Sequence, residues 1–185
     1  PDSTKWSDEF VFINNTYSNR QLTTGIATFD ALNNKGRLYE NAASATFEAD
    51  HLTSNPIDLA FVPQDNIWLS FYYEPGGLAD MPEDQDSLSL HFYAPDEGKW
   101  YSAWRVAGND KPGFKQVTIR IDNPKFLKKG FRFRFINYAS LSPSLNDPSM
   151  GSNCDHWNLD YVLLDTTIPF DTALIAYLNK RERLL

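Results

Sequence analysis

Hydrophobic and polar residues alternate with a period of two along much of this chain. The clearest run is 130–136, in which Phe131, Phe133 and Phe135 alternate with Arg132 and Arg134. A similar run, 86–93, alternates leucine and phenylalanine with serine and histidine. Because successive side chains of a strand point to opposite faces, this pattern predicts antiparallel strands that cover a core on one side and face water on the other.

Further strands are predicted by apolar or alternating runs that end at Gly, Pro, Asn or Asp. These runs are 10–13, 25–30, 46–59, 67–73, 99–106, 114–121 and 156–164. With the two runs above, the chain has about nine strands and no internal repeat or linker. Strands at this spacing favour an all-β, antiparallel jelly-roll β-sandwich of the concanavalin or galactose-binding-like kind.

The C-terminal residues have a different pattern. Asp171 can cap a helix over 172–178, and basic residues follow near its end, where they suit the helix dipole. We therefore predict a sandwich domain over 1–168 and a short C-terminal helix within an extension over 169–185. We expect both to be part of a larger protein.

Composition excludes several classes of protein. The net charge is −7 and no run of five basic residues occurs, which argues against nucleic-acid binding. No apolar run of 18 residues occurs, so the sequence predicts no membrane span. Cys154 is the single cysteine, which leaves no intramolecular disulfide. Aromatic residues make up 15% of the chain and favour a core built from strands.

The order of the strand motifs resembles a known family. The segments FYYEPGG, DSLSLHFY, GKWYSAWRVAG, FKQVTIRI, FRFRFINYAS and DHWNLDYVLLD follow one another over 71–165. This series resembles MAM-like jelly-roll domains, and in particular the adhesin-like domains of Bacteroidota cell-surface proteins exported by the type IX secretion system. The resemblance covers about residues 6–165. It implies a secreted or outer cell-surface location and a role in adhesion or ligand binding.

The resemblance also implies a structural calcium ion, since such modules often join their first and last strands through Ca²⁺. A hard cation takes six to eight oxygen ligands. The carboxylates that we expect to supply them are Asp160, Asp155, Asp30 and Asp50. A second acidic cluster, in the loop before the strand at 86–93, comprises Glu83, Asp84 and Asp86. The alternative for each carboxylate is a solvated or hydrogen-bonded group without metal.

Aromatic side chains are the candidate ligand-binding residues. Trp100, Tyr101 and Trp104 lie on one predicted strand, and Tyr72 and Tyr93 lie on neighbouring ones. A sugar ring stacks on an exposed aromatic face while neighbouring polar groups bind its hydroxyls. The spacing of four predicts that Trp100 and Trp104 share a face. If that face is the core face, these residues have a packing role only.

No catalytic motif is present. Glu74, Glu83, Asp86 and Asp155 are acidic residues in or near loops, but their spacing selects no acid–base pair. No serine-hydrolase, zinc-protease or phosphate-loop motif occurs.

We therefore expect a non-catalytic module of a larger secreted protein that binds a glycan, or else an extracellular matrix or surface protein. A structural spacer without a ligand and an accessory domain of a secreted hydrolase are the alternatives. Flanking domains of the same polypeptide are its other expected partners.

Overall fold

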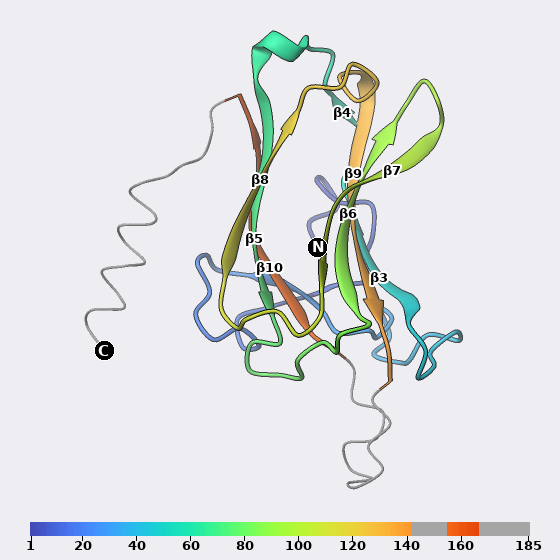
Figure 1. Ribbon diagram of the computed structural model, residues 1–185, viewed down its shortest axis with the longest axis vertical. Helices are drawn as coiled ribbons and strands as arrows, with labels where there is room; N and C mark the ends of the chain where they lie inside the picture. Colours follow the sequence, from blue (N-terminus) through green and yellow to red (C-terminus); the bar gives the residue numbers. More distant parts are fainter. Residues whose placement is uncertain (142–154, 167–185) are drawn as a thin grey trace, which may run out of the picture.

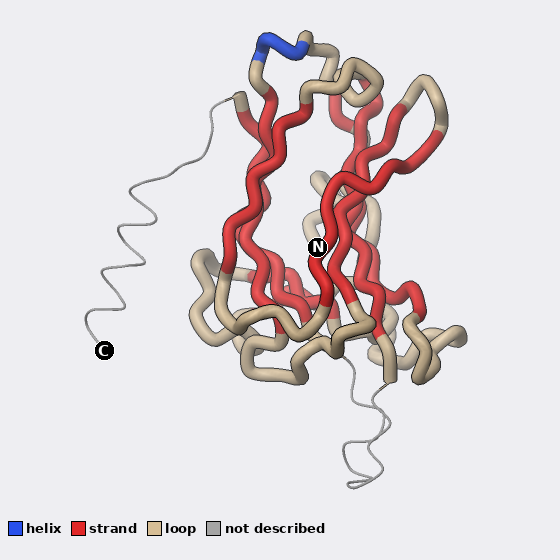
Figure 2. The backbone as a smooth tube through the Cα atoms, viewed as in Figure 1, coloured by secondary structure: helices blue, strands red, loops and turns tan. Residues whose placement is uncertain are grey.

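The computed structural model describes residues 1–141 and 155–166 of the 185-residue chain. Nearly all of its regular structure is strand, with one short 3₁₀ helix, η1 (Pro63–Asp65), at one end of the molecule (Figure 2). Two sheets face each other, with β5, β8 and β10 in one and β3, β6, β7 and β9 in the other (Figure 1). The predicted C-terminal helix and Cys154 lie outside the described residues.

The first sheet has the strand order β1-β2-β10-β5-β8. Every pairing in it is antiparallel. The last strand, β10, lies at its centre and joins the N-terminal strands to the longer β5. The strands are β1 (Phe12–Asn14), β2 (Ile26–Phe29), β5 (Ile67–Pro75), β8 (Lys115–Ile121) and β10 (Trp157–Asp165).

The second sheet has the order β3-β9-β6-β7, and the short β4 also pairs with β9. From β2 onward, the chain passes from one sheet to the other at each connection, with two exceptions. β6 and β7 form a hairpin within the second sheet, and β3 and β4 both pair with β9. This is the chain path of a jelly roll, so the fold prediction is confirmed. The strands are β3 (Phe47–Thr53), β4 (Ile57–Asp58), β6 (Ser87–Ala94), β7 (Lys99–Ala107) and β9 (Lys129–Ala139).

The core lies between the two sheets and is largely aromatic. The phenylalanines of β9 point inward as the alternation predicts, and Phe131 and Phe135 are fully buried. The Phe135 ring meets Phe71 of the opposite sheet edge to face, with ring centroids 4.9 Å apart. Such pairs add to the stabilisation that comes from burying the rings. The alternation that buries these rings also fixes which side chains face outward.

A β-bulge in the β6–β7 pair changes the faces of β7. Trp104 pairs with Leu90, whereas Ser102 pairs with His91, so Ala103 is an extra residue on β7. Because one extra residue reverses the alternation, Trp100 and Trp104 lie on opposite faces. The prediction that they share a face is therefore wrong. Trp104 packs inward against Phe71, at a ring distance of 5.2 Å.

We predict that Phe135→Ala lowers the free energy of unfolding by about 3–5 kcal/mol, because it removes a fully buried ring between the sheets. Phe12→Ala is the control, since Phe12 is 51% exposed, and it should change stability by less than about 0.5 kcal/mol. Urea unfolding of the three proteins measures both effects. Equal, small losses for the two variants would contradict this description of the core.

Candidate functional site

The outward side of the second sheet carries rows of polar and aromatic side chains. We call the surface formed by the outward residues of β3, β9, β6 and β7 the outer face. Its residues follow from the strand register, since they alternate with the buried phenylalanines of β9 and the buried leucines of β6. Successive rows are two residues apart, which is about 7 Å along a strand.

The first row of the outer face is aromatic at one end and cationic at the other. Trp100 of β7 pairs with Tyr93 of β6, which pairs with Arg132 of β9. The rings of Trp100 and Tyr93 are 5.1 Å apart and inclined at 50°. All three residues are partly exposed. Two tilted aromatic rings beside a guanidinium group form a surface on which a planar or sugar-like ring can stack.

The second row contains Arg134, whose side chain contacts residues of two other strands. Arg134 of β9 lies between His91 of β6 and Thr53 of β3. Its guanidinium carbon is 4.4 Å from the centre of the Trp100 ring, and its Nε donates a 2.7 Å hydrogen bond to Thr53 Oγ1. These two contacts hold both the arginine and the tryptophan in place. Burial lowers the pKa of the neighbouring His91, which favours its neutral form at pH 7.

The third and fourth rows extend the polar surface. Arg105 of β7 pairs with Ser89 of β6 in the third row, and Tyr138 of β9 pairs with Glu48 of β3 in the fourth. The Glu48 carboxylate is 2.7 Å from His51 Nε2 in the third row. Burial, followed by the charge of Glu48, raises the pKa of Tyr138, which therefore stays protonated at pH 7 and can donate a hydrogen bond.

The structure disperses four of the aromatic residues that the sequence selected. Trp100 lies on the outer face, and Trp104 is partly buried and packs against the core. Tyr72 is buried on β5 of the other sheet, with its ring 6.4 Å from that of Tyr161. Tyr101 packs beside Phe126 with a ring distance of 6.0 Å, on the side of β7 opposite to Trp100. Tyr72 also has polar neighbours in the register, Asp160 and Gln116, but it is only 5% exposed. Trp100 is therefore the one of the four that lies partly exposed on the outer face.

Sequence reasoning missed most of the residues that accompany Trp100. Tyr93 belonged to the predicted aromatic group, but His91, Arg132 and Arg134 were visible only as the polar side of two alternating strands. The pairing of β6 with both β7 and β9 brings them together. The alternating arginines in 130–136 were the available signal, but the register that places them beside Trp100 is a tertiary feature.

Asp160, a predicted metal ligand, is surrounded by hydrogen-bond donors. Its Oδ2 accepts from the backbone N–H groups of Leu22 and Thr23, at 2.8 and 2.9 Å. Its Oδ1 accepts from the Thr23 hydroxyl at 2.5 Å and from the Tyr161 N–H at 2.8 Å. Donors on both oxygens explain why a carboxylate is 3% exposed here. The side chain fastens the loop that precedes β2 to the central strand.

Asp30 and Asp50, two more predicted metal ligands, lie near each other, Asp30 directly after β2 and Asp50 on β3. Asp50 is fully buried, and its oxygens accept from the Ala31 N–H at 2.7 Å and from the Tyr39 hydroxyl at 2.9 Å. Burial, followed by repulsion from Asp30, raises the pKa of Asp50 to about 7. A buried acid of this kind stabilises the fold most when it is protonated.

We predict that this carboxyl makes stability fall as pH rises. The unfolded state has the lower pKa, so the contribution of Asp50 is complete below about pH 4 and is lost as the pH rises through about 7. Between pH 5 and pH 8 the wild type should lose about 2–3 kcal/mol of stability relative to Asp50→Asn, at about 1.4 kcal/mol per pKa unit. Denaturant unfolding at several pH values, without divalent cations, measures the difference. Parallel pH profiles for the two proteins would contradict the assignment.

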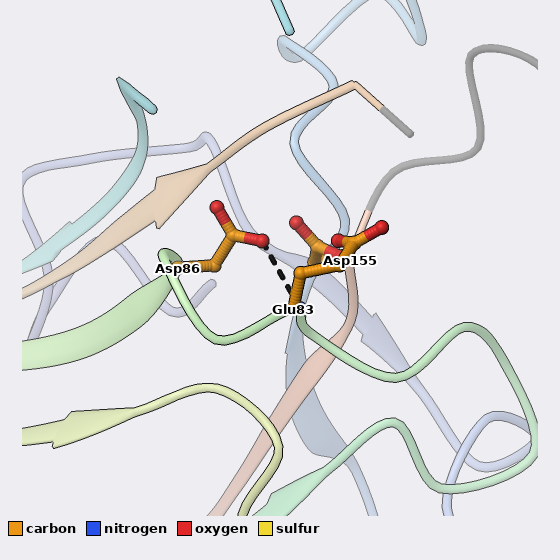
Figure 3. A group of neighbouring side chains, drawn as sticks. All are labelled: Glu83, Asp86 and Asp155. Carbon is orange, nitrogen blue, oxygen red and sulfur yellow. Dashed lines mark hydrogen bonds between the residues drawn. The ribbon is translucent and has the colours of Figure 1, made fainter. Parts of the chain in front are cut away.

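Asp155, the fourth predicted ligand, lies in a carboxylate cluster with Glu83 and Asp86 (Figure 3). Candidate ligand oxygens of these three residues lie within 4.8 Å of one another, and in the described residues no other group of three has this property. Asp86 is fully buried, with Oδ2 accepting from the Glu83 N–H and the Ser140 hydroxyl, both at 3.1 Å. Within the described part of the chain, Asp86 Oδ1 has no hydrogen-bond donor.

The cluster is better suited to binding a cation than to catalysis. Burial and the neighbouring acids raise the pKa of Asp155, because three like charges at this distance cannot all ionise without a cation or protons. Three carboxylates are suitable oxygen ligands for Ca²⁺. A glycosidase pair must flank a sugar, whereas Asp86 and Asp155 are both buried. Of the predicted second cluster, Asp84 is exposed.

We expect millimolar Ca²⁺ to raise the melting temperature of the wild type by about 5 °C, because a bound cation relieves the repulsion among the three carboxylates. Asp86→Asn should abolish this increase. Asp84→Asn, which changes an exposed neighbour by the same chemical step, should retain it. Thermal unfolding with added calcium and with chelator makes the measurement. No calcium effect on the wild type would rule out a stabilising calcium ion at the cluster.

Comparison with known proteins identifies no family. No protein-family model matches the chain, and no curated protein matches it. Within the described residues, no helix is long and apolar enough to cross a membrane.

Several solved structures are similar to this chain at low sequence identity. The carbohydrate-binding module CBM28, described as specific for non-crystalline cellulose, has a TM-score of 0.43 at 12% identity, over 86% of each chain. A second carbohydrate-binding module, "Family 16 Carbohydrate Binding Module-2", has a TM-score of 0.44 at 13% identity, over 86% of this chain and 89% of that one.

An arabinose-bound MgGH51 α-L-arabinofuranosidase has a TM-score of 0.43 at 10% identity, over 86% of this chain. This chain spans 22% of the length of that enzyme. Since these three scores are below 0.5, the function of this protein has to be derived from its own residues.

Proposed function

We propose that this domain is a non-catalytic carbohydrate-binding module and that it binds its glycan along the outer face. The observation that carries the proposal is the arrangement around Trp100. Its ring lies beside Tyr93 and against Arg134, and all three residues are partly exposed on one sheet surface.

The chemistry of this face suits a sugar chain. A pyranose presents C–H groups that stack on an aromatic ring and hydroxyl groups that need donors and acceptors nearby. Arg132, Arg134 and Tyr138 supply donors, and Glu48 supplies an acceptor. The four rows extend over about 20 Å along the strands, which is long enough to contact several sugar units of an extended polysaccharide.

The location of the protein remains a prediction from the resemblance, and so does its place within a larger polypeptide. An exported adhesion module, with flanking domains and a glycan on its outer face, agrees with the proposed activity. A spacer domain without a ligand is the main competing hypothesis. It predicts that no substitution on the outer face changes binding to any glycan.

Trp100→Ala should weaken binding to polysaccharide at least about tenfold, which corresponds to about 1.4 kcal/mol, because it removes the larger of the two stacking rings. Tyr101→Ala is the matched control, since Tyr101 is the next residue of β7 and lies on the opposite side. Affinity electrophoresis against a panel of neutral and acidic soluble polysaccharides ranks the wild type and both variants.

The two variants also separate the competing hypotheses. Loss of binding in Tyr101→Ala with retention in Trp100→Ala would place the site on the other side of β7 and contradict the proposal. Failure of the wild type to bind any polysaccharide of the panel would favour the spacer.

A further inference from the structure

We propose that the glycan bound on the outer face is acidic and that Arg132 and Arg134 bind its uronic-acid carboxylates. This inference rests on the proposed function and adds the chemical class of the ligand. It is carried by the charges of the outer face, which differ in sign from those of the chain as a whole.

The outer face is cationic although the chain as a whole is acidic. The chain has a net charge of −7. Its outer face nevertheless carries Arg105, Arg132 and Arg134, with Glu48 as the acidic residue of the four rows. In the part of the chain that the structure describes, none of the three arginines forms a salt bridge with a carboxylate. An acidic protein that gathers unneutralised arginines on one sheet surface has a surface complementary to an anion.

The geometry makes these arginines suitable for carboxylate binding. Arg132 and Arg134 are two residues apart on β9, so they lie on the same face about 7 Å from each other. Arg134 is held by Thr53 Oγ1 and by the Trp100 ring, so little side-chain freedom is lost when a ligand binds. A guanidinium group pairs with a carboxylate through two parallel N–H···O bonds, which a neutral sugar cannot offer.

The position of Trp100 explains why the anion should belong to a sugar. Arg132 shares a row with Tyr93 and Trp100, so a ring that stacks on the aromatic pair carries its substituents toward the guanidinium groups. A uronic acid has both required parts, a stacking ring and a carboxylate attached directly to it. A free anion or a neutral hexose has only one of the two.

Polygalacturonate, alginate and hyaluronan are the probes, each compared with its carboxyl-reduced form, in which the carboxylate has become a hydroxymethyl group. We expect the wild type to bind at least one of the acidic polymers and to lose about tenfold in affinity on its reduced form. Binding to the acidic polymer should also weaken with added NaCl, which screens an exposed ion pair.

Arg132→Gln should remove most of the difference between the acidic and reduced polymers. Arg120→Gln is the matched control, because Arg120 also lies over a tryptophan, Trp68, at 6.0 Å, but on β8 of the other sheet. It changes the net charge equally and should alter affinity by less than about twofold. Arg134→Lys keeps the charge without the planar fork and should give an intermediate loss. Unchanged thermal unfolding shows that each variant is folded.

The outcomes distinguish failure of this inference from failure of the proposed function. Equal binding to acidic and reduced polymers would overturn the uronic-acid assignment and leave glycan binding intact. Equal or tighter binding to a single-stranded oligodeoxynucleotide would overturn it as well, by showing a surface for any polyanion. No binding to any polysaccharide, acidic or reduced, would overturn both.

Discussion

The alternation of β9 is the constraint on which the rest of this structure depends. On one side of the strand, Phe131, Phe133 and Phe135 fill the space between the sheets. On the other side, Arg132 and Arg134 face outward. Because a shift of one residue would exchange the two sets, the aromatic core fixes the register. The same register fixes where the cationic groups lie, so the packing of the core and the charge of the outer face both follow from one pattern.

Two local features complete the outer face. The bulge at Ala103 turns Trp100 outward while Trp104 packs against the core. Arg134 then joins β9 to β7 and β3 through Trp100 and Thr53. A straight β7 would have placed both tryptophans on one side, so Trp100 could not lie beside Arg134 while Trp104 packs against the core. β-Bulges often redirect a side chain in this way next to functional sites.

The sequence predicts the strands of this protein well because period-two alternation is a local signal. The site is harder to predict, because it depends on pairings between distant segments. Nothing in the residues 99–106 marks Ala103 as an extra residue, so Trp100 and Trp104 looked equivalent. Asp160 is similar, since the backbone donors that surround it come from Leu22 and Thr23, far away in the sequence. The carboxylate cluster also forms only when the loop before β6 meets the start of β10.

The most direct test of the central claim is to map the bound glycan on the protein by NMR. Backbone amide shifts of the labelled domain would be followed during titration with an oligosaccharide from whichever polysaccharide it binds. We predict that the largest changes lie in β6, β7 and β9, around Tyr93, Trp100 and Arg134. Changes centred instead on β5 and β8 of the first sheet, or on the acidic loop before β6, would contradict the assignment of the outer face.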